Sequence, residues 1–268
     1  MSRLSSGGGF TLIEVIIAIA VISILATMAI PYAAKIIDQT RTETTRQRMM
    51  DLHKTIAGDP ATGPAGFVGD MGRLPAMDTL TQLNTALAPA SSAQYLGVRM
   101  GWNGPYINSG FDPTSYYKDA WGTVLRYGHT TSPPVDSAGQ IRSAGADRNF
   151  GTADDLVYPS IAVVFTGSLL VNLYVWDNAA AAYVLNPQPA AYPGMTAAVT
   201  FYYSNNGVQT TGAAGSPAAP PYTFTNFHAG CHAVSATCTL PPRPAGSGQA
   251  VANVPGNSQQ AQLNLYLR

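Results

Sequence analysis

Charged side chains are scarce in this 268-residue chain, and neither sign is in excess. Lys, Arg, Asp and Glu make up 10% of the residues, whereas ordinary soluble domains carry about 25%. The 14 basic residues balance the 14 acidic ones. A protein whose main partner is a nucleic acid needs a basic surplus to neutralise phosphates, so the balance argues against that class. It also argues against an acidic disordered tail.

Cysteine is equally rare, with only Cys231 and Cys238 in the chain. Two cysteines are too few for a disulfide scaffold but allow one bridge. Export to an oxidising compartment would favour a Cys231–Cys238 disulfide, which the chain-entropy account values at about 2–3 kcal/mol. The alternative is two reduced cysteines in a core. A zinc site with His228 and His232 is disfavoured, because two cysteines at alternating strand positions do not form a compact ligand set.

The motifs of the common hydrolases are also missing. The chain has neither a Gly-x-Ser-x-Gly elbow nor a His-Glu-x-x-His helix, the arrangements that present a nucleophile or a zinc ion. Only three charged residues (Asp177, Arg243 and Arg268) follow position 160, so this part of the chain can place scarcely any acid or base. These absences argue against an enzyme.

One long apolar run is present near the amino terminus. Its 21 residues, Phe10 to Ile30, contain a single charge, Glu14, and about 20 residues suffice for a helix to cross a bilayer. A segment that is apolar all round is not an amphipathic helix of a soluble domain. A secretory signal peptide has a shorter apolar part of about 7–15 residues. A plain anchor has no use for Glu14, since an acid is costly in lipid.

The residues at the start of this run carry a more specific signal. The string Gly7-Gly8-Gly9-Phe10-Thr11-Leu12-Ile13-Glu14-Val15 resembles the prepilin cleavage signature of type IV pilins and type II secretion pseudopilins. The resemblance implies that a prepilin peptidase cuts after Gly9 and that Phe10 becomes the N-methylated amino terminus. It also implies that Glu14 meets the Phe10 amine of a neighbouring subunit and thereby sets the axial register of a filament.

Pro31 marks the end of the apolar run, where the helix either stops or kinks. A kink is favoured because a helical pattern resumes after it, with apolar residues such as Met49, Leu52 and Ile56 among mixed charges. We therefore expect one kinked helix over residues 10–57. Its first half would be buried in a membrane or filament core, and its second half would pack on a head domain.

A loop with three acids follows in the middle of the chain. Residues 141–156 contain Asp147, Asp154 and Asp155, with glycines that allow tight turns. Calcium takes about six to eight oxygen ligands, and such a loop can supply several, although it lacks the EF-hand spacing. On spacing alone, a calcium loop and an ordinary acidic surface turn are both compatible with this pattern.

A second resemblance covers this region. The segments GWNGPYI (101–107), DAWGTVLRY (119–127) and SAGADRNFGTADDL (143–156) are similar in order and spacing to the major pseudopilin of type II secretion. The likeness spans residues 7–158. Arg148 departs from the family, which usually has glycine there. The resemblance implies a structural Ca²⁺ ion held by the side chains of Asp147, Asp154 and Asp155 and by the carbonyl groups of Ala144 and Thr152.

The last 109 residues extend beyond the end expected for such a protein, near Pro159. Alternating or continuous apolar runs, separated by Gly, Pro and Asn turns, predict short strands. The expected strands lie at residues 161–165, 169–176, 197–203, 222–227, 232–239 and 261–267. Strands at this spacing predict an antiparallel β-sandwich.

The sequence thus predicts an α+β fold. A long N-terminal hydrophobic helix would pack on a small pseudopilin-type head with an antiparallel β-sheet and a calcium loop, and an all-β sandwich would follow. The expected divisions are a leader peptide (1–9), the helix (10–57), the head (58–159) and the sandwich (160–268).

The expected function is structural, as a subunit of a type IV pilus-like or type II secretion pseudopilus filament. The filament would be a helical homo-oligomer joined through the N-terminal helix, with prepilin peptidase and the inner-membrane assembly machinery as further partners and no nucleic acid. The protein would reside in the bacterial inner membrane before assembly and then in a periplasmic or extracellular filament. Two alternatives stay open: a minor tip pilin whose sandwich binds a surface, a sugar or a secreted protein, and a membrane-anchored periplasmic protein without a filament role.

Overall fold

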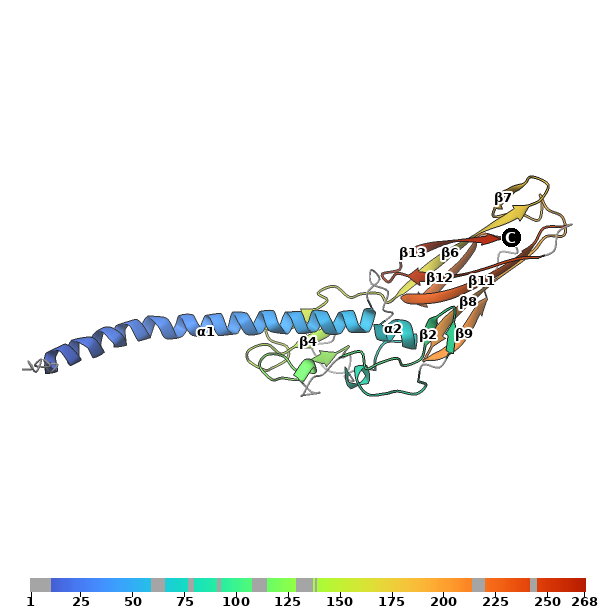
Figure 1. The fold of residues 1–268 in the computed structure, drawn as a ribbon. Helices are drawn as coiled ribbons and strands as arrows, with labels where there is room; N and C mark the ends of the chain where they lie inside the picture. The colour runs from blue at the N-terminus through green and yellow to red at the C-terminus, as the bar shows by residue number, and fades with distance from the viewer. Residues whose placement is uncertain are drawn as a thin grey trace, which may run out of the picture.

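A computed structural model describes residues 11–58, 66–76, 80–90, 93–107, 115–128, 137, 139–213, 220–241 and 245–268. The molecule is elongated, with a long helix at one end, β-sheets at the other, and a small mixed region alongside the helix between them (Figure 1). This arrangement confirms the predicted α+β class, in which a long apolar N-terminal helix precedes a mostly β part.

Helix α1 runs from Leu12 to Ala57 without interruption. Pro31 lies inside it, and Figure 1 shows a gentle bend in the first half rather than a sharp kink. A proline removes one main-chain hydrogen bond, and the 46-residue helix continues on both sides of it. Gly58 closes the helix by donating its N–H to the Lys54 carbonyl oxygen at 2.8 Å, with a φ of 81° that favours glycine.

The second half of α1 buries one stripe of side chains. Thr45, Met49, Leu52 and Ile56 are at most 2% exposed, and their spacing of three and four residues places them on one helix face. The three apolar members share a core with the short helix α2 (Gly66–Met71), the 3-10 turn η1 (Leu80–Leu83) and a small sheet. The other fully or nearly buried apolar residues of this core include Phe67, Val68, Met71, Leu80, Leu83, Leu125, Tyr127 and Ile141.

The small sheet beside α1 has three antiparallel strands. In spatial order they are β3 (Arg126–Tyr127), β4 (Ile141–Ser143) and β5 (Leu156–Tyr158). A hairpin of β1 (Ala93–Tyr95) and β2 (Val98–Met100) and a 3-10 turn η2 (Ser115–Tyr117) complete the region. The loop after η2 is tied to α1, because the Arg48 guanidinium donates to the Lys118 carbonyl oxygen at 2.9 Å.

The C-terminal part consists of two four-stranded sheets. One has the order β10 (Tyr222–His228), β6 (Thr166–Asp177), β13 (Gln260–Leu267), with β7 (Ala182–Leu185) paired to β6. The other has the order β12 (Gly246–Val254), β11 (Gly230–Thr239), β8 (Thr196–Asn205), β9 (Val208–Ala213).

Strand pairing in these two sheets is antiparallel with one exception. Strand β13 runs parallel to β6, from Gln260 opposite Ser168 to Leu267 opposite Val175. The exception arises because the chain leaves β12 in one sheet and enters the other sheet beside β6 instead of turning back as a hairpin. The expectation of a purely antiparallel arrangement therefore misses this pair.

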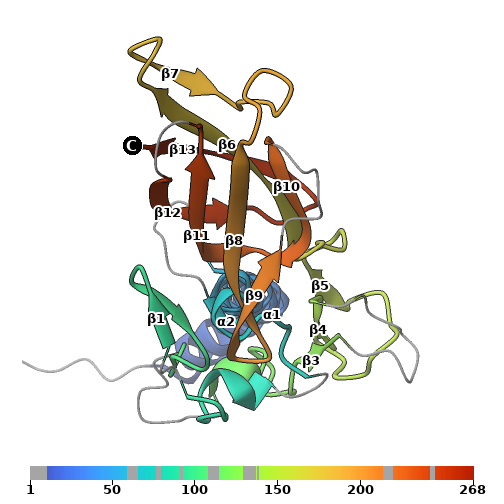
Figure 2. The same cartoon turned by 90° about the vertical axis from the view of Figure 1, so that its right-hand side faces the viewer.

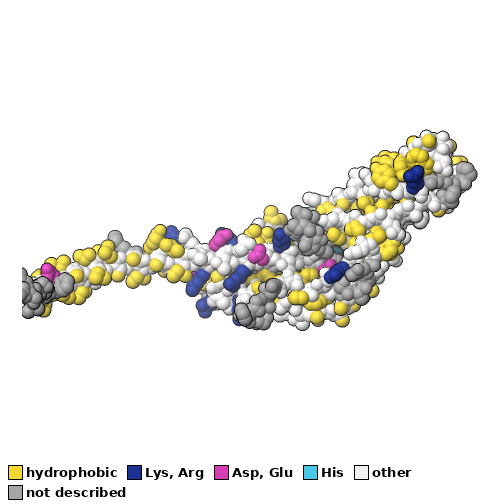
Figure 3. Space-filling model, in the orientation of Figure 1, with side chains coloured by type: hydrophobic (Ala, Val, Ile, Leu, Met, Phe, Trp, Pro, Cys, Tyr) yellow, Lys and Arg dark blue, Asp and Glu magenta, His cyan; other side chains and the backbone are white. Residues whose placement is uncertain are grey.

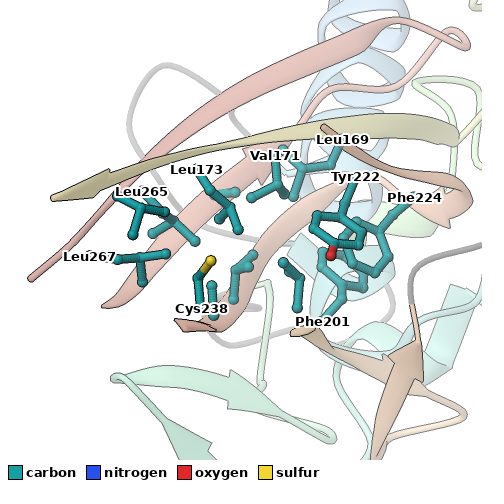
Figure 4. Packing of buried hydrophobic residues seen from close by; sticks show 14 of the residues in the cluster. Leu169, Val171, Leu173, Phe201, Tyr222, Phe224, Cys238, Leu265 and Leu267 are labelled. Carbon is teal, nitrogen blue, oxygen red and sulfur yellow. The ribbon is translucent and has the colours of Figure 1, made fainter. Parts of the chain in front are cut away.

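One apolar core lies between the two sheets (Figure 4). Alternate residues of β6, namely Leu169, Val171 and Leu173, are fully buried, as the two-residue period of a strand requires. They meet Phe201 of β8 and Leu265 of β13 from other strands. Burying each such side chain stabilises the fold by about 1.5–3 kcal/mol.

The two-sheet part is joined to the helix region through α2, whose six residues are all buried. Figure 2 shows α1 and α2 end-on beneath β8 and β11. At this junction the backbones of Gly69 and Gly230 approach so closely that a Cβ added to Gly230 would lie 2.7 Å from the Gly69 Cα. The Gly207 N–H also donates to the Met71 carbonyl oxygen at 2.8 Å. The molecule is therefore closely packed across this boundary.

Candidate functional site

The first turn of α1 is a capping box formed by Thr11 and Glu14. The Glu14 carboxylate accepts from the Thr11 N–H at 2.8 Å and from the Thr11 hydroxyl at 2.9 Å, while the Glu14 N–H donates to Thr11 Oγ1 at 3.3 Å. Gly9 and Phe10, the predicted processing residues, lie outside the described residues. Glu14 thus has a partner within its own chain, which the sequence interpretation missed although Thr-x-x-Glu before an apolar run is a known capping signal.

The first half of α1 exposes apolar side chains all round. Leu12, Ile22 and Ile30 are between 64% and 79% exposed, and Figure 3 shows the hydrophobic surface along this part of the helix. The helix is long and apolar enough to cross a membrane, and its apolar window is not buried in the structure. Signal sequences meet the same criteria of length and composition. The cleavage signature is therefore what distinguishes this helix from a signal sequence.

All the charged residues of α1 beyond Pro31 except the half-buried Arg48 lie on exposed positions. They include Lys35, Asp38, Arg41 and Glu43, and Figure 3 shows cationic and acidic side chains where the helix reaches the rest of the molecule. The apolar and polar parts of α1 are therefore separated along the helix rather than around it. A boundary of this kind separates an apolar first half from a second half whose charged face meets water while its buried stripe packs on the rest of the chain.

The three acids of the predicted calcium loop are engaged by the loop itself. Asp154 accepts from the Asp147 N–H at 3.0 Å and from the Thr152 hydroxyl at 2.7 Å, and these bonds hold the pKa of Asp154 below its usual value. Asp155 accepts from the Gly151 N–H at 2.8 Å and forms an ion pair with Arg142 at 3.2 Å. The loop is ordered by protein donors in this conformation.

The residues implied as calcium ligands are near one another in sequence, and the carboxylates of Asp154 and Asp155 both accept hydrogen bonds from groups of the loop. Within the described part of the chain, no group of three or more His, Cys, Asp or Glu side chains is placed to hold a metal ion. Ala144 is fully buried at the end of β4. Arg148 adopts a left-handed φ of 60°, the conformation that glycine adopts more readily. Calcium would have to compete with Arg142 for Asp155, and the calcium site stays a prediction.

The predicted disulfide between Cys231 and Cys238 is wrong. Both cysteines lie on strand β11, opposite Asn253 and Gly246 of β12 respectively, and both are thiols. Seven residues of extended strand separate their Cα atoms by about 23 Å and turn their side chains to opposite faces, whereas a disulfide needs Cα atoms within about 7 Å. Cys238 lies in the core between the sheets, and burial raises its pKa to about 11.

The two histidines near the cysteines form a structural contact. The His232 ring is 2% exposed and its Nε2 lies 2.7 Å from the His228 carbonyl oxygen. Desolvation lowers the pKa of His232 to about 4, so the ring is neutral at physiological pH. No described residue joins these histidines in a metal-binding group.

Comparison with known proteins locates the site at the amino terminus. The family described as "Prokaryotic N-terminal methylation motif" matches residues 5–30. The chain therefore carries a type IV pilin-like prepilin signal on a long apolar helix. No curated protein and no solved structure matches the chain. The 238 residues that follow position 30 thus have no counterpart in these comparisons.

Proposed function

We propose that this protein is a structural subunit of a type IV pilus-like or type II secretion pseudopilus filament. The observation that carries the proposal is the methylation motif at residues 5–30, which coincides with the exposed apolar half of α1. Before assembly this half spans the inner membrane, and after prepilin peptidase cleavage it forms the filament core with neighbouring copies.

The exposed apolar surface supports this role because it needs a covering. Burying one exposed Ile or Leu side chain contributes about 1.5–3 kcal/mol, and α1 exposes such residues on every side from Leu12 to Ile30. Lipid covers the surface in the monomer, and the helices of other copies cover it in the filament. The second half of α1 does not need this covering, since it packs on its own chain.

Glu14 changes partner on assembly in this proposal. In the isolated chain its carboxylate caps the helix through Thr11. In the filament it pairs with the Phe10 amine of a neighbour, because a charge inside an apolar core is tolerated only when it is paired. The change sets the axial position of one subunit relative to the next.

The test separates the charge of Glu14 from its capping role. Glu14→Gln keeps a capping side chain at this position but removes the charge, whereas Thr11→Ala removes the cap and keeps the charge. We expect mass spectrometry to find mature chains beginning at methylated Phe10 in both variants. Glu14→Gln should fail to enter filaments and Thr11→Ala should enter them.

Two outcomes would contradict the proposal. A mature amino terminus other than methylated Phe10 would favour a membrane-anchored periplasmic protein without a filament role. Normal incorporation of the Glu14→Gln variant would refute the role of Glu14 in register. The calcium ion belongs to the same proposal as a stabiliser of the head.

A second candidate is a minor subunit at the filament tip. It is favoured by the position of the two large sheets, which lie beyond the C-terminal end of α1 and farthest from its amino terminus (Figure 1). Copy number distinguishes the candidates in isolated filaments. Labelling of this protein along the whole fibre supports the first candidate, and labelling of this protein at one end only supports the second.

A further inference from the structure

The outer face of the sheet formed by β10, β6, β13 and β7 carries a cluster of aromatic side chains. Leu169, Val171 and Leu173 of β6 point into the core, so the alternate residues point outward. The cluster consists of Tyr174 and Trp176 on β6, Tyr183 on β7 and Tyr266 on β13. Figure 3 shows hydrophobic side chains gathered beside a cationic one in this region, at the end of the molecule remote from α1.

The rings contact one another in an ordered arrangement. Tyr266 stacks on Tyr174 with centroids 4.7 Å apart, and Tyr183 meets Tyr266 edge-on at 5.3 Å. Trp176 meets Tyr183 at 5.1 Å, and the Arg268 guanidinium lies 5.8 Å from the Trp176 ring centre. Despite these contacts, Tyr183 is 40% and Tyr266 57% exposed. The cluster therefore offers rigid aromatic surface to solvent.

Three asparagine side chains beside the cluster are linked by hydrogen bonds that all run in the same donor-to-acceptor direction. The Leu173 N–H donates to Asn186 Oδ1 at 2.9 Å, which identifies that atom as the oxygen. Asn186 Nδ2 then donates to Asn172 Oδ1 at 2.9 Å, and Asn172 Nδ2 donates to Asn264 Oδ1 at 3.0 Å. Because each amide has one acceptor atom and one donor atom, this series of hydrogen bonds ends with Asn264 Nδ2, a donor on an exposed residue of β13.

The face has almost no charge. Among the Lys, Arg, Asp and Glu residues, these four strands contain only Asp177. Its carboxylate accepts from the Ala179 N–H at 2.8 Å and from the Tyr192 hydroxyl at 3.1 Å. Arg268 lies at the border of the cluster, over Trp176. A strongly anionic ligand would find a single cation here, and a cationic ligand would find one carboxylate that is already engaged.

We propose that this face is a binding site for a neutral carbohydrate chain. A sugar ring has a face of C–H groups, which packs on an aromatic ring, and a rim of hydroxyl groups, which exchange hydrogen bonds with amides and tyrosine hydroxyls. Tyr266 and Tyr183 supply the ring surface, and Asn264 supplies a donor to a hydroxyl oxygen. The neighbouring outward positions along β13, Asn264 and Tyr266, are about 7 Å apart, a separation that one sugar residue can bridge.

The site goes beyond the filament role and does not depend on it, because every residue named lies on the two-sheet part and none on α1. The outer positions of the sheet from the Asn264 row to the Trp176 row extend over about 13 Å. Roughly two or three consecutive sugar residues fit this length. A polysaccharide chain is therefore better matched to the face than a single sugar.

The test measures retention of the full-length protein by defined polysaccharides. The chain is kept in a polyoxyethylene detergent, since detergents with sugar headgroups would compete for the site. Native gels are cast with hydroxyethyl cellulose, galactomannan, amylopectin or soluble glycol chitin as neutral probes, and with alginate as an anionic one. We expect at least one neutral probe to retard the wild-type protein.

The variants assign the retardation to this face. Tyr266→Ala should weaken binding about tenfold, the loss expected for one stacked ring. Asn264→Asp should weaken it similarly, because the carboxylate still accepts from Asn172 but can no longer donate. Tyr266→Phe should bind, and so should Tyr95→Ala, a matched control on the other stacked tyrosine pair (Tyr95 and Tyr202, centroids 4.0 Å apart).

Three outcomes would overturn the proposal. The first is the absence of retardation of the wild-type protein by every neutral probe. The second is equal retardation of wild type and Tyr266→Ala, and the third is stronger retardation by alginate than by any neutral probe. If Tyr266→Ala loses self-association in sedimentation but is retarded as strongly as wild type, the face serves contacts between copies of this chain instead.

Discussion

The close contact between Gly69 and Gly230 joins the helix region to the two-sheet part, and its contribution to the free energy of unfolding can be predicted. Gly230 begins β11 with a φ of 144°, and an added Cβ would meet the Gly69 Cα at 2.7 Å. An alanine there is strained by its backbone conformation, which costs about 1–3 kcal/mol. It also pushes two backbones apart, and overpacking of this kind costs about 1–3 kcal/mol. We expect Gly230→Ala to lower the free energy of unfolding by about 3–4 kcal/mol.

Gly97→Ala is the matched control for this substitution. Gly97 has a φ of 78° in the turn between β1 and β2, and an added Cβ would meet nothing within 4 Å. This variant contains backbone strain without the clash, so it should cost about 1–2 kcal/mol. A difference of about 2 kcal/mol between the variants is therefore the part due to the close approach of α2 and β11.

Calorimetry of the full-length protein in detergent measures both variants. For a folded part of this size, 1 kcal/mol shifts the melting temperature by about 2–4 °C, so Gly230→Ala should melt about 6–16 °C below wild type. One shared transition should move if the two parts unfold together. Equal melting temperatures for Gly230→Ala and Gly97→Ala would refute the argument that the contact holds the parts together.

Three further predictions concern titration, metal and thiols. Burial raises the pKa of Asp70 to about 6, so between about pH 4 and pH 6 the folded state holds a proton that the unfolded state has released. The free energy of unfolding should therefore fall by up to about 3 kcal/mol as the pH rises from 4 to 6. Asp70→Asn should flatten this fall when it is measured by urea titration at each pH. If the head binds calcium, changing Asp154 and Asp155 together to Ala should lower the melting temperature in calcium and change little in chelator; equal melting of wild type and variant in calcium would contradict the site. Cys231 and Cys238 should both react with a thiol reagent in denaturant without reductant. If neither reacts, the two cysteines form a disulfide and the structural argument against it is wrong.

Local patterns in the sequence predict much of this fold. The spacing of Met49, Leu52 and Ile56 predicts the buried face of α1, and the alternation of residues 169–176 predicts a strand with one face in a core. Helix and strand periods are properties of short segments, so they can be read without knowledge of what lies opposite.

Features that depend on distant segments were not predictable in this way. Cys231 and Cys238 lie on one uninterrupted strand that is paired with β12 along its whole length between them, and their separation along this strand excludes their disulfide. The parallel partner of β6 is β13, about ninety residues later in the chain. The aromatic cluster draws Tyr174, Tyr183 and Tyr266 from three strands, so no single stretch of sequence contains its pattern.

The candidate site also has features that short segments predict and features that depend on residues farther apart. The prepilin signal is a contiguous motif and is found at residues 5–30. The capping box of Thr11 and Glu14 is also local, and the Thr-x-x-Glu spacing would have revealed it. The calcium ligands were inferred by resemblance, and the engagement of Asp155 by Arg142, thirteen residues earlier, shows what spacing alone leaves out.

The parallel pairing of β6 and β13 has a mechanical consequence. Strand β6 extends lengthwise from the end of α1 to the remote end of the molecule (Figure 1), and β13 follows it over eight paired residues, from Gln260 to Leu267. A pull between α1 and a ligand held at that remote end runs along these strands, so it loads their hydrogen bonds in shear. Bonds loaded in shear resist together instead of opening one after another. We therefore expect this strand pair to bear tension along the long axis of the molecule.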